Sequence, residues 1–131
     1  MGFFMEFDAR NNILRLTIEG PLTDQIMFDV FRTAGRYAQS RPPCRSITDL
    51  SKVTVHEVSS DAIRELAKIP APAPTFPRVV VATKDYSYAM SRMFQILAEQ
   101  TRPNFHVVHT MDEAYRLLGV VKPEFSPVVP E

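Results

Sequence analysis

From Leu14 to Glu19 the chain alternates between apolar and polar side chains, which is typical of a β-strand with one buried face. Leu14, Leu16 and Ile18 fall on one side of such a strand, and their polar neighbours fall on the other. The aromatic-rich segment 3–7 precedes this strand across a polar turn. We therefore predict an antiparallel hairpin whose second strand ends at Gly20.

A different pattern marks the middle of the chain. Val79, Val80 and Val81 form an uninterrupted β-branched run, which favours a strand buried on both faces of a parallel sheet. Shorter apolar segments at 46–50 and 105–109 predict two further strands. We expect the first of these to lead into a polar turn, and ligands often bind beside such turns at the carboxyl edge of α/β sheets.

Apolar residues at helical spacing fill the intervals between these strands. The predicted helices are one that follows Thr23, one that opens at Ser59 or Ser60, one from about Tyr88 to Thr101, and one between Thr110 and Gly119. Leu97 and Leu117 are expected to lie on the buried faces of the last two helices.

Strands that alternate with helices predict an α/β fold with a mostly parallel sheet. We expect five strands, of which the N-terminal one is an antiparallel edge strand, and four helices. Residues 1–121 then form a single domain. The tail at 122–131 is rich in proline and is expected to be extended or mobile.

Charge and composition narrow the function classes. The chain of 131 residues carries 15 basic and 15 acidic side chains, so its net charge is zero, which argues against nucleic-acid binding. No apolar stretch approaches the roughly 20 residues of a membrane span, and the start lacks the pattern of a signal peptide. Cys44 is the only cysteine, which excludes an internal disulfide and favours the cytoplasm.

Three segments carry a family resemblance. Residues 47–60 read as a strand, a turn and a serine pair at a helix start; residues 89–99 read as an apolar helix; and residues 107–114 lead from a strand into a helix with an acidic pair. In this order they resemble the STAS-like, or SpoIIAA-like, domain family, in particular a bacterial branch related to STAS and CRAL-TRIO lipid-transfer domains. The resemblance implies a SpoIIAA-like β-α superhelix and a small regulatory module, similar to anti-sigma-factor antagonists, that binds a protein partner.

The phosphorylation motif of that family, Asp-Ser-Ser/Thr-Gly, is matched here at its serine pair. Ser59 and Ser60 are therefore candidate phosphoacceptors by resemblance, and candidate caps of the following helix by position. Asp61 stands where the family has Gly, and its charge would repel a phosphate. The predicted partner surface consists of Asp49, Lys52, His56, Glu57, Asp61 and Arg64.

The third predicted helix supports an alternative function. Its methionines and aromatic residues either belong to the core or line a pocket for a lipid or another apolar small molecule, because Met adapts to varied apolar guests. The candidate pocket residues are Tyr86, Tyr88, Met90, Met93 and Phe94. The oligomeric state stays open, a homodimer included.

The sequence contains few of the residue patterns that are typical of catalytic sites. Asp49 and Lys84 follow strands as in a phosphoreceiver site, but Glu19 offers at best one of the further carboxylates that such a metal site needs. No metal-ligand cluster, nucleophile–base pair or glycine-rich phosphate loop stands out. We therefore expect a non-catalytic protein without metal or cofactor, acting as a regulatory protein-interaction module or as a binding module for an apolar small molecule.

Overall fold

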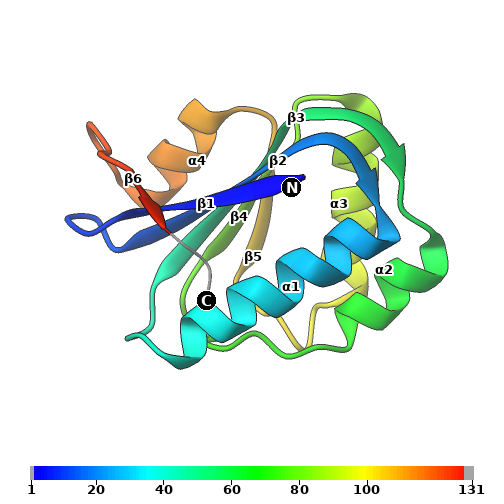
Figure 1. The fold of residues 1–131 in the computed structure, drawn as a ribbon, viewed down its shortest axis with the longest axis horizontal. Coiled ribbons are helices and arrows are strands. Elements are labelled where there is room, and N and C mark those ends of the chain that lie inside the picture. Colours follow the sequence, from blue (N-terminus) through cyan, green and yellow to red (C-terminus); the bar gives the residue numbers. More distant parts are fainter. Residues whose placement is uncertain (1, 129–131) are drawn as a thin grey trace.

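A six-stranded mixed sheet forms the centre of the computed structural model, which describes residues 2–128 (Figure 1). The strands are β1 (Phe3–Asp8), β2 (Ile13–Thr23), β3 (Arg45–Glu57), β4 (Arg78–Val81), β5 (Phe105–Val108) and β6 (Ser126–Val128). The helices are α1 (Asp24–Gln39), α2 (Ser60–Ala67), α3 (Asp85–Leu97) and α4 (Met111–Leu118). The strand order is β5-β4-β3-β2-β1-β6. The predicted α/β class and the four helices are confirmed.

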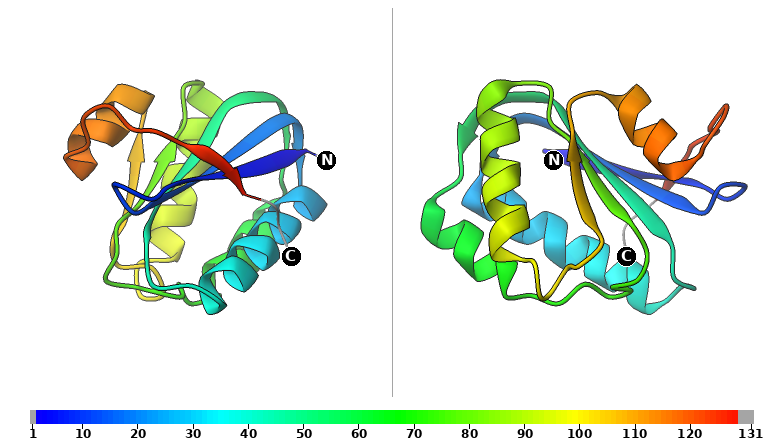
Figure 2. Two further views of the ribbon diagram at one scale, coloured as in Figure 1. Left: turned by 60° about the vertical axis from the view of Figure 1, so that its left-hand side comes forward. Right: turned by 180° about the vertical axis from the view of Figure 1, so that it is seen from behind.

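The helices cover the two faces of the sheet unequally (Figures 1 and 2). Helix α1 packs its buried residues Val30 and Tyr37 against one face, and α2 and α3 lie on the same side. Helix α4 covers the other face, where Ala114 and Leu118 pack against the sheet. The two hydrophobic clusters are therefore separated by the sheet itself.

Strand β4 shows why the valine run was informative. It lies between β3 and β5, and both pairings are parallel. Val79 and Val81 pack into the cluster beneath α4, whereas Val80 points into the cluster beneath α1. All three valines are buried, which confirms the prediction of a strand buried on both faces.

The prediction of five strands and of an N-terminal edge strand is wrong. Strand β6 comes from the proline-rich tail and pairs antiparallel with β1, so β1 lies between β6 and β2. The fully buried carboxylate of Asp8 helps to hold the tail, because it accepts a hydrogen bond from the Glu124 amide at 3.0 Å. A three-residue strand with a central proline carries little periodicity, which explains why the sequence did not reveal it. Residues 129–131 of the tail lie outside the described residues.

Strands β2 and β3 are longer than predicted. Strand β2 continues through Gly20 and Pro21 to Thr23, and β3 continues through the predicted polar turn to Glu57. Their parallel pairing shifts register between Thr17 and Glu19 and again between Gly20 and Pro21. These irregularities let the pair absorb a proline, which has no N–H to donate, and a glycine with a φ of +76°.

The buried faces of α3 and α4 also differ from the prediction. Helix α3 begins earlier, at Asp85, and presents Ser87 and Ser91 to the interior. Leu97 is 45% exposed, and Leu117 on α4 is 43% exposed, so both were wrongly placed in the core. Small serines allow a close approach of α3 to the sheet, and this packing outweighs the apolar spacing of the helix.

Candidate functional site

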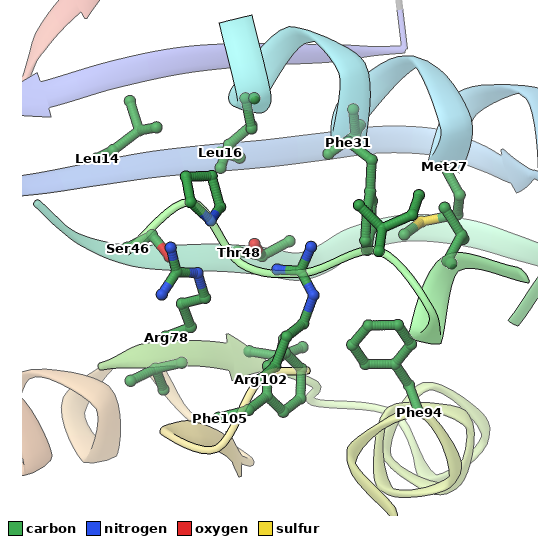
Figure 3. Close-up of a pocket in the computed structure, with 18 of the residues that line it drawn as sticks. Leu14, Leu16, Met27, Phe31, Ser46, Thr48, Arg78, Phe94, Arg102 and Phe105 are labelled. Atoms are coloured by element: carbon green, nitrogen blue, oxygen red, sulfur yellow. The ribbon is translucent and has the colours of Figure 1, made fainter. Parts of the chain in front are cut away.

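A cavity of about 250 Å³ lies between the sheet and helices α1, α2 and α3 (Figure 3). Its walls are mostly apolar, with Leu16 and Leu50 from the sheet facing Phe31 and Phe94 from the helices. Protein interiors are close-packed and contain few voids larger than a water molecule. A pocket of this size between the sheet and three helices is therefore a candidate binding site.

Aromatic side chains link the walls of the cavity. The ring of Phe94 on α3 meets the ring of Phe31 on α1 edge-on, with centroids 5.8 Å apart, and meets the ring of Phe105 on β5 at 5.1 Å. After the end of α3, the Thr101 hydroxyl donates a 2.6 Å hydrogen bond to the carbonyl of Ala67, the last residue of α2. These contacts hold α1, α2 and α3 around the space.

The cavity opens at the amino edge of the parallel strands. Its exposed lining residues lie in two loops, one before β3 and one before β4. They are Pro42, Pro43, Ile69, Pro70 and Pro72. The sequence directed attention to the opposite, carboxyl edge of the sheet, so this opening was missed.

Two arginines bring positive charge to the apolar cavity. Arg78 begins β4, and Arg102 lies in the loop that leads to β5. Figure 3 shows both guanidinium groups directed into the space between the sheet and α1. Among the described lining residues there is no Asp or Glu, so the charge of the two arginines is not balanced within the cavity.

The guanidinium of Arg102 is poorly satisfied. Its carbon atom lies 4.8 Å from the centroid of the Phe31 ring, and its Nε is buried without a hydrogen-bond partner among residues 2–128. Burial, with the charge of Arg78 as a second cause, lowers its pKa to about 10. Arg102 therefore stays protonated at neutral pH despite its unfavourable surroundings.

Arg78 is held in place by the connector that precedes it. Its Nη1 donates hydrogen bonds to the carbonyl oxygens of Ala73, at 2.7 Å, and Phe76, at 3.0 Å. Burial lowers the pKa of this guanidinium as well. Ser46 lies opposite Arg78 on β3, and Thr48 follows it on the same strand, so two hydroxyl groups line the cavity beside the arginines (Figure 3).

His56 forms the far end of the cavity, at the carboxyl edge of β3. Its Nε2 is hydrogen-bonded to the fully buried Ser87 hydroxyl at 2.5 Å, and its ring meets Tyr86 edge-on with centroids 5.1 Å apart. Its Nδ1 is buried and has no partner in the described part of the chain. Burial, followed by the nearby charge of Lys84, lowers the pKa of His56.

Ser59 is the N-cap of α2. Its hydroxyl accepts a hydrogen bond from the Ala62 amide at 3.1 Å and donates one to the carboxylate of Asp24 at 2.8 Å. Asp24 also accepts from the Ser59 amide, so this contact joins the start of α1 to the start of α2. Ser60 is the exposed first residue of α2. A phosphoacceptor role for either serine stays a prediction, and a phosphate on Ser59 would face the Asp24 carboxylate.

The predicted partner surface is only partly a surface. Asp49 is buried, and its carboxylate accepts the Ser51 amide within its own strand. His56 is directed toward the cavity. The other four predicted residues, Lys52, Glu57, Asp61 and Arg64, are exposed, and Asp61 forms an ion pair with Arg64 at 3.2 Å.

The residues predicted to form an apolar pocket do not all lie together. Met90 and Phe94 line the cavity, whereas Tyr86, Tyr88 and Met93 do not. Tyr88 instead stacks on His109, with ring centroids 4.0 Å apart. The two arginines were not predicted from the sequence. Arg78 is the first residue of β4 and Arg102 lies shortly before β5, and both are positions that solvent-exposed arginines and arginines in salt bridges also occupy.

Replacing the cap of α2 tests the role of the serine pair. Ser59→Ala should lower the free energy of unfolding by about 0.5–2 kcal/mol, because the Ala62 amide loses its acceptor. Ser60→Ala is the matched control and should be nearly neutral, since the Ser60 side chain is exposed. Urea denaturation of both variants measures the difference. An equal or larger loss in Ser60→Ala would contradict the assignment.

Acidification should destabilise the fold through His56. Its pKa is lowered from the ordinary value of 6.5, so below that pH the unfolded chain takes up a proton that the folded chain resists. The contribution of His56 to stability is complete above pH 6.5 and is lost as the pH falls. Urea denaturation at about pH 7.5 and about pH 5.5 should show a smaller loss in His56→Gln than in the wild type. An NMR titration midpoint of the His56 ring above 6.5 would contradict this.

Comparison with known proteins identifies no family for this chain. No protein-family model matches the chain, and no curated protein matches it. Over residues 2–128, none of the helices combines the length and the apolar character needed to cross a membrane. In the same range, histidine, cysteine and carboxylate side chains form no group of three or more that could hold a metal ion.

Proposed function

We propose that this chain is a binding module for a small apolar molecule, which it holds in the cavity between the sheet and helices α1, α2 and α3. The observation that carries this proposal is a pocket of about 250 Å³ with mostly apolar walls between the sheet and three helices. An apolar guest would restore the dispersion contacts that the lining side chains lack.

The size of the cavity limits the guest. At roughly 30 Å³ for each water-sized group, as in liquid water, about 250 Å³ accommodates a molecule of about eight non-hydrogen atoms. This volume suits a medium-length hydrocarbon chain and is too small for a two-chain lipid. The proline-lined opening before β3 and β4 gives such a chain a route into the interior.

The regulatory protein-interaction module, which was the first prediction from the sequence, stays a prediction. Its proposed surface retains four exposed residues, none of which lines the cavity. Membership of a STAS-like family likewise stays a proposal, to which the α/β class lends general support. The relation of one branch of that family to lipid-transfer domains agrees with an apolar ligand.

A matched pair of substitutions at Gly35 tests the proposed function. Gly35 lies on α1 and lines the cavity, and a Cβ added there would have nothing within 4 Å. Gly35→Leu should reduce the binding of 1-octanol, because its side chain would occupy part of the space. Gly35→Ala should retain binding, and both variants should be more stable by up to about 1 kcal/mol, because a mid-helix glycine is replaced.

Isothermal titration calorimetry with 1-octanol measures both variants against the wild type. If all three proteins bind 1-octanol with equal affinity, the alcohol does not bind in the cavity beside Gly35. Absence of binding to the wild type at saturating alcohol would contradict the proposed function itself.

A further inference from the structure

We propose that the ligand of this cavity carries one negative charge, a carboxylate, which is bound by Arg102 and Arg78 at the amino edge of the sheet. This inference rests on the proposed function and adds the chemistry of the polar end of the ligand. It identifies the ligand class as a medium-chain monocarboxylic acid, with the hydrocarbon chain in the apolar part of the cavity.

The unbalanced charge of the cavity is the first observation. Arginines are almost never buried unless they are paired, because removing a charge from water is costly. Yet no carboxylate among residues 2–128 forms an ion pair with Arg78 or Arg102, and no acidic residue lines the cavity. The two positive charges also oppose each other. An anion between them would relieve both costs together.

The unused donors are the second observation. Nε of Arg102 is buried and has no partner among residues 2–128, and the guanidinium lies over the face of the Phe31 ring. In the described residues, Arg78 uses only Nη1, so its Nε and Nη2 remain for an acceptor. A guanidinium has a planar set of donors that fits the two oxygens of a carboxylate. The Thr48 and Ser46 hydroxyl groups beside them can donate further hydrogen bonds.

The gradient of polarity along the cavity orients the ligand. Arg78, Ser46 and Phe105 are direct neighbours at the amino ends of β4, β3 and β5. Toward the carboxyl ends of the strands the lining is mostly apolar, with Leu22, Leu50, Met27, Val58 and Met90, and His56 lies at the far end. A fatty acid would therefore place its carboxylate near the opening and its chain beneath α1 and α3. The limit of about eight non-hydrogen atoms suits the eight carbons of octanoate, with the carboxylate oxygens at the opening.

A comparison of octanoate with 1-octanol on the full chain tests this inference. The two probes have the same hydrocarbon chain and differ in charge. The wild type should bind octanoate at least tenfold more tightly than 1-octanol, because the acid gains charge-assisted hydrogen bonds. Arg102→Met should abolish most of this preference while it retains the binding of 1-octanol. Arg92→Met is the matched control on the exposed side of α3 and should keep the preference unchanged.

The stability of the ligand-free protein gives a second readout. Arg102→Met should raise its melting temperature, because a buried charge without a counterion is removed. An arginine with a purely structural role would instead lower the melting temperature when replaced. The wild-type comparison of the two probes keeps the test valid even if a variant fails to fold.

The outcomes separate the two levels of the proposal. Equal affinities for octanoate and 1-octanol, or a preference for the alcohol, would overturn the anionic ligand and leave an apolar ligand in place. A preference for octanoate that survives in both Arg102→Met and Arg78→Met would overturn the assignment to these arginines. If neither probe binds the wild type, the proposed function fails and this inference fails with it.

Discussion

The parallel pairing of the two long strands β2 and β3 sets the shape of the rest of the molecule. The pairing extends from Ile13 to Thr23 on one strand and from Arg45 to Glu57 on the other, with two shifts of register. Helix α1 starts where β2 ends, and α2 starts soon after β3 ends, so both helices turn back over one face from the same edge. The contact between Asp24 and Ser59 fixes these two starts to each other. The space beneath the helices follows from this geometry.

The large features of the fold could be predicted because they depend on local pattern. The valine run of β4 and the capping box at Thr110 and Glu113 each carried their own signal. Features that depend on tertiary packing could not be predicted in this way. Pro21 remains inside a strand because a register shift accommodates it, and Leu97 is exposed because Ser87 and Ser91 pack inward instead.

The candidate site was harder to predict than the fold for the same reason. Met90 and Phe94 were identified from helical spacing, and both line the cavity. Arg78 begins β4 and Arg102 lies in the loop before β5, so only the folded chain brings them together, and a single sequence does not reveal that pairing. A cavity also depends on how side chains from distant segments pack together, so no sequence motif reveals it. The apolar residues that suggest a core also suggest a pocket.

Two partly buried guanidinium groups without an acidic partner in the cavity are the central feature of this site. Arg102 lies over the Phe31 ring and its Nε has no partner among residues 2–128, so an apolar residue of similar shape in its place would be expected to be more stable. Such a cost is typical of positions where a ligand completes the interactions. The apolar walls and the two positive charges together fit the proposed ligand, an anion with a hydrocarbon chain.

A crystal structure of the chain with octanoate is the most direct measurement of this account. The account predicts density for the acid inside the cavity, with its carboxylate oxygens about 2.7–2.9 Å from the guanidinium nitrogens of Arg102 and Arg78. The hydrocarbon chain should extend toward Leu50 and Met90. A cavity closed by its own side chains, with the acid absent from it or bound only at the outer surface of the protein, would contradict the account.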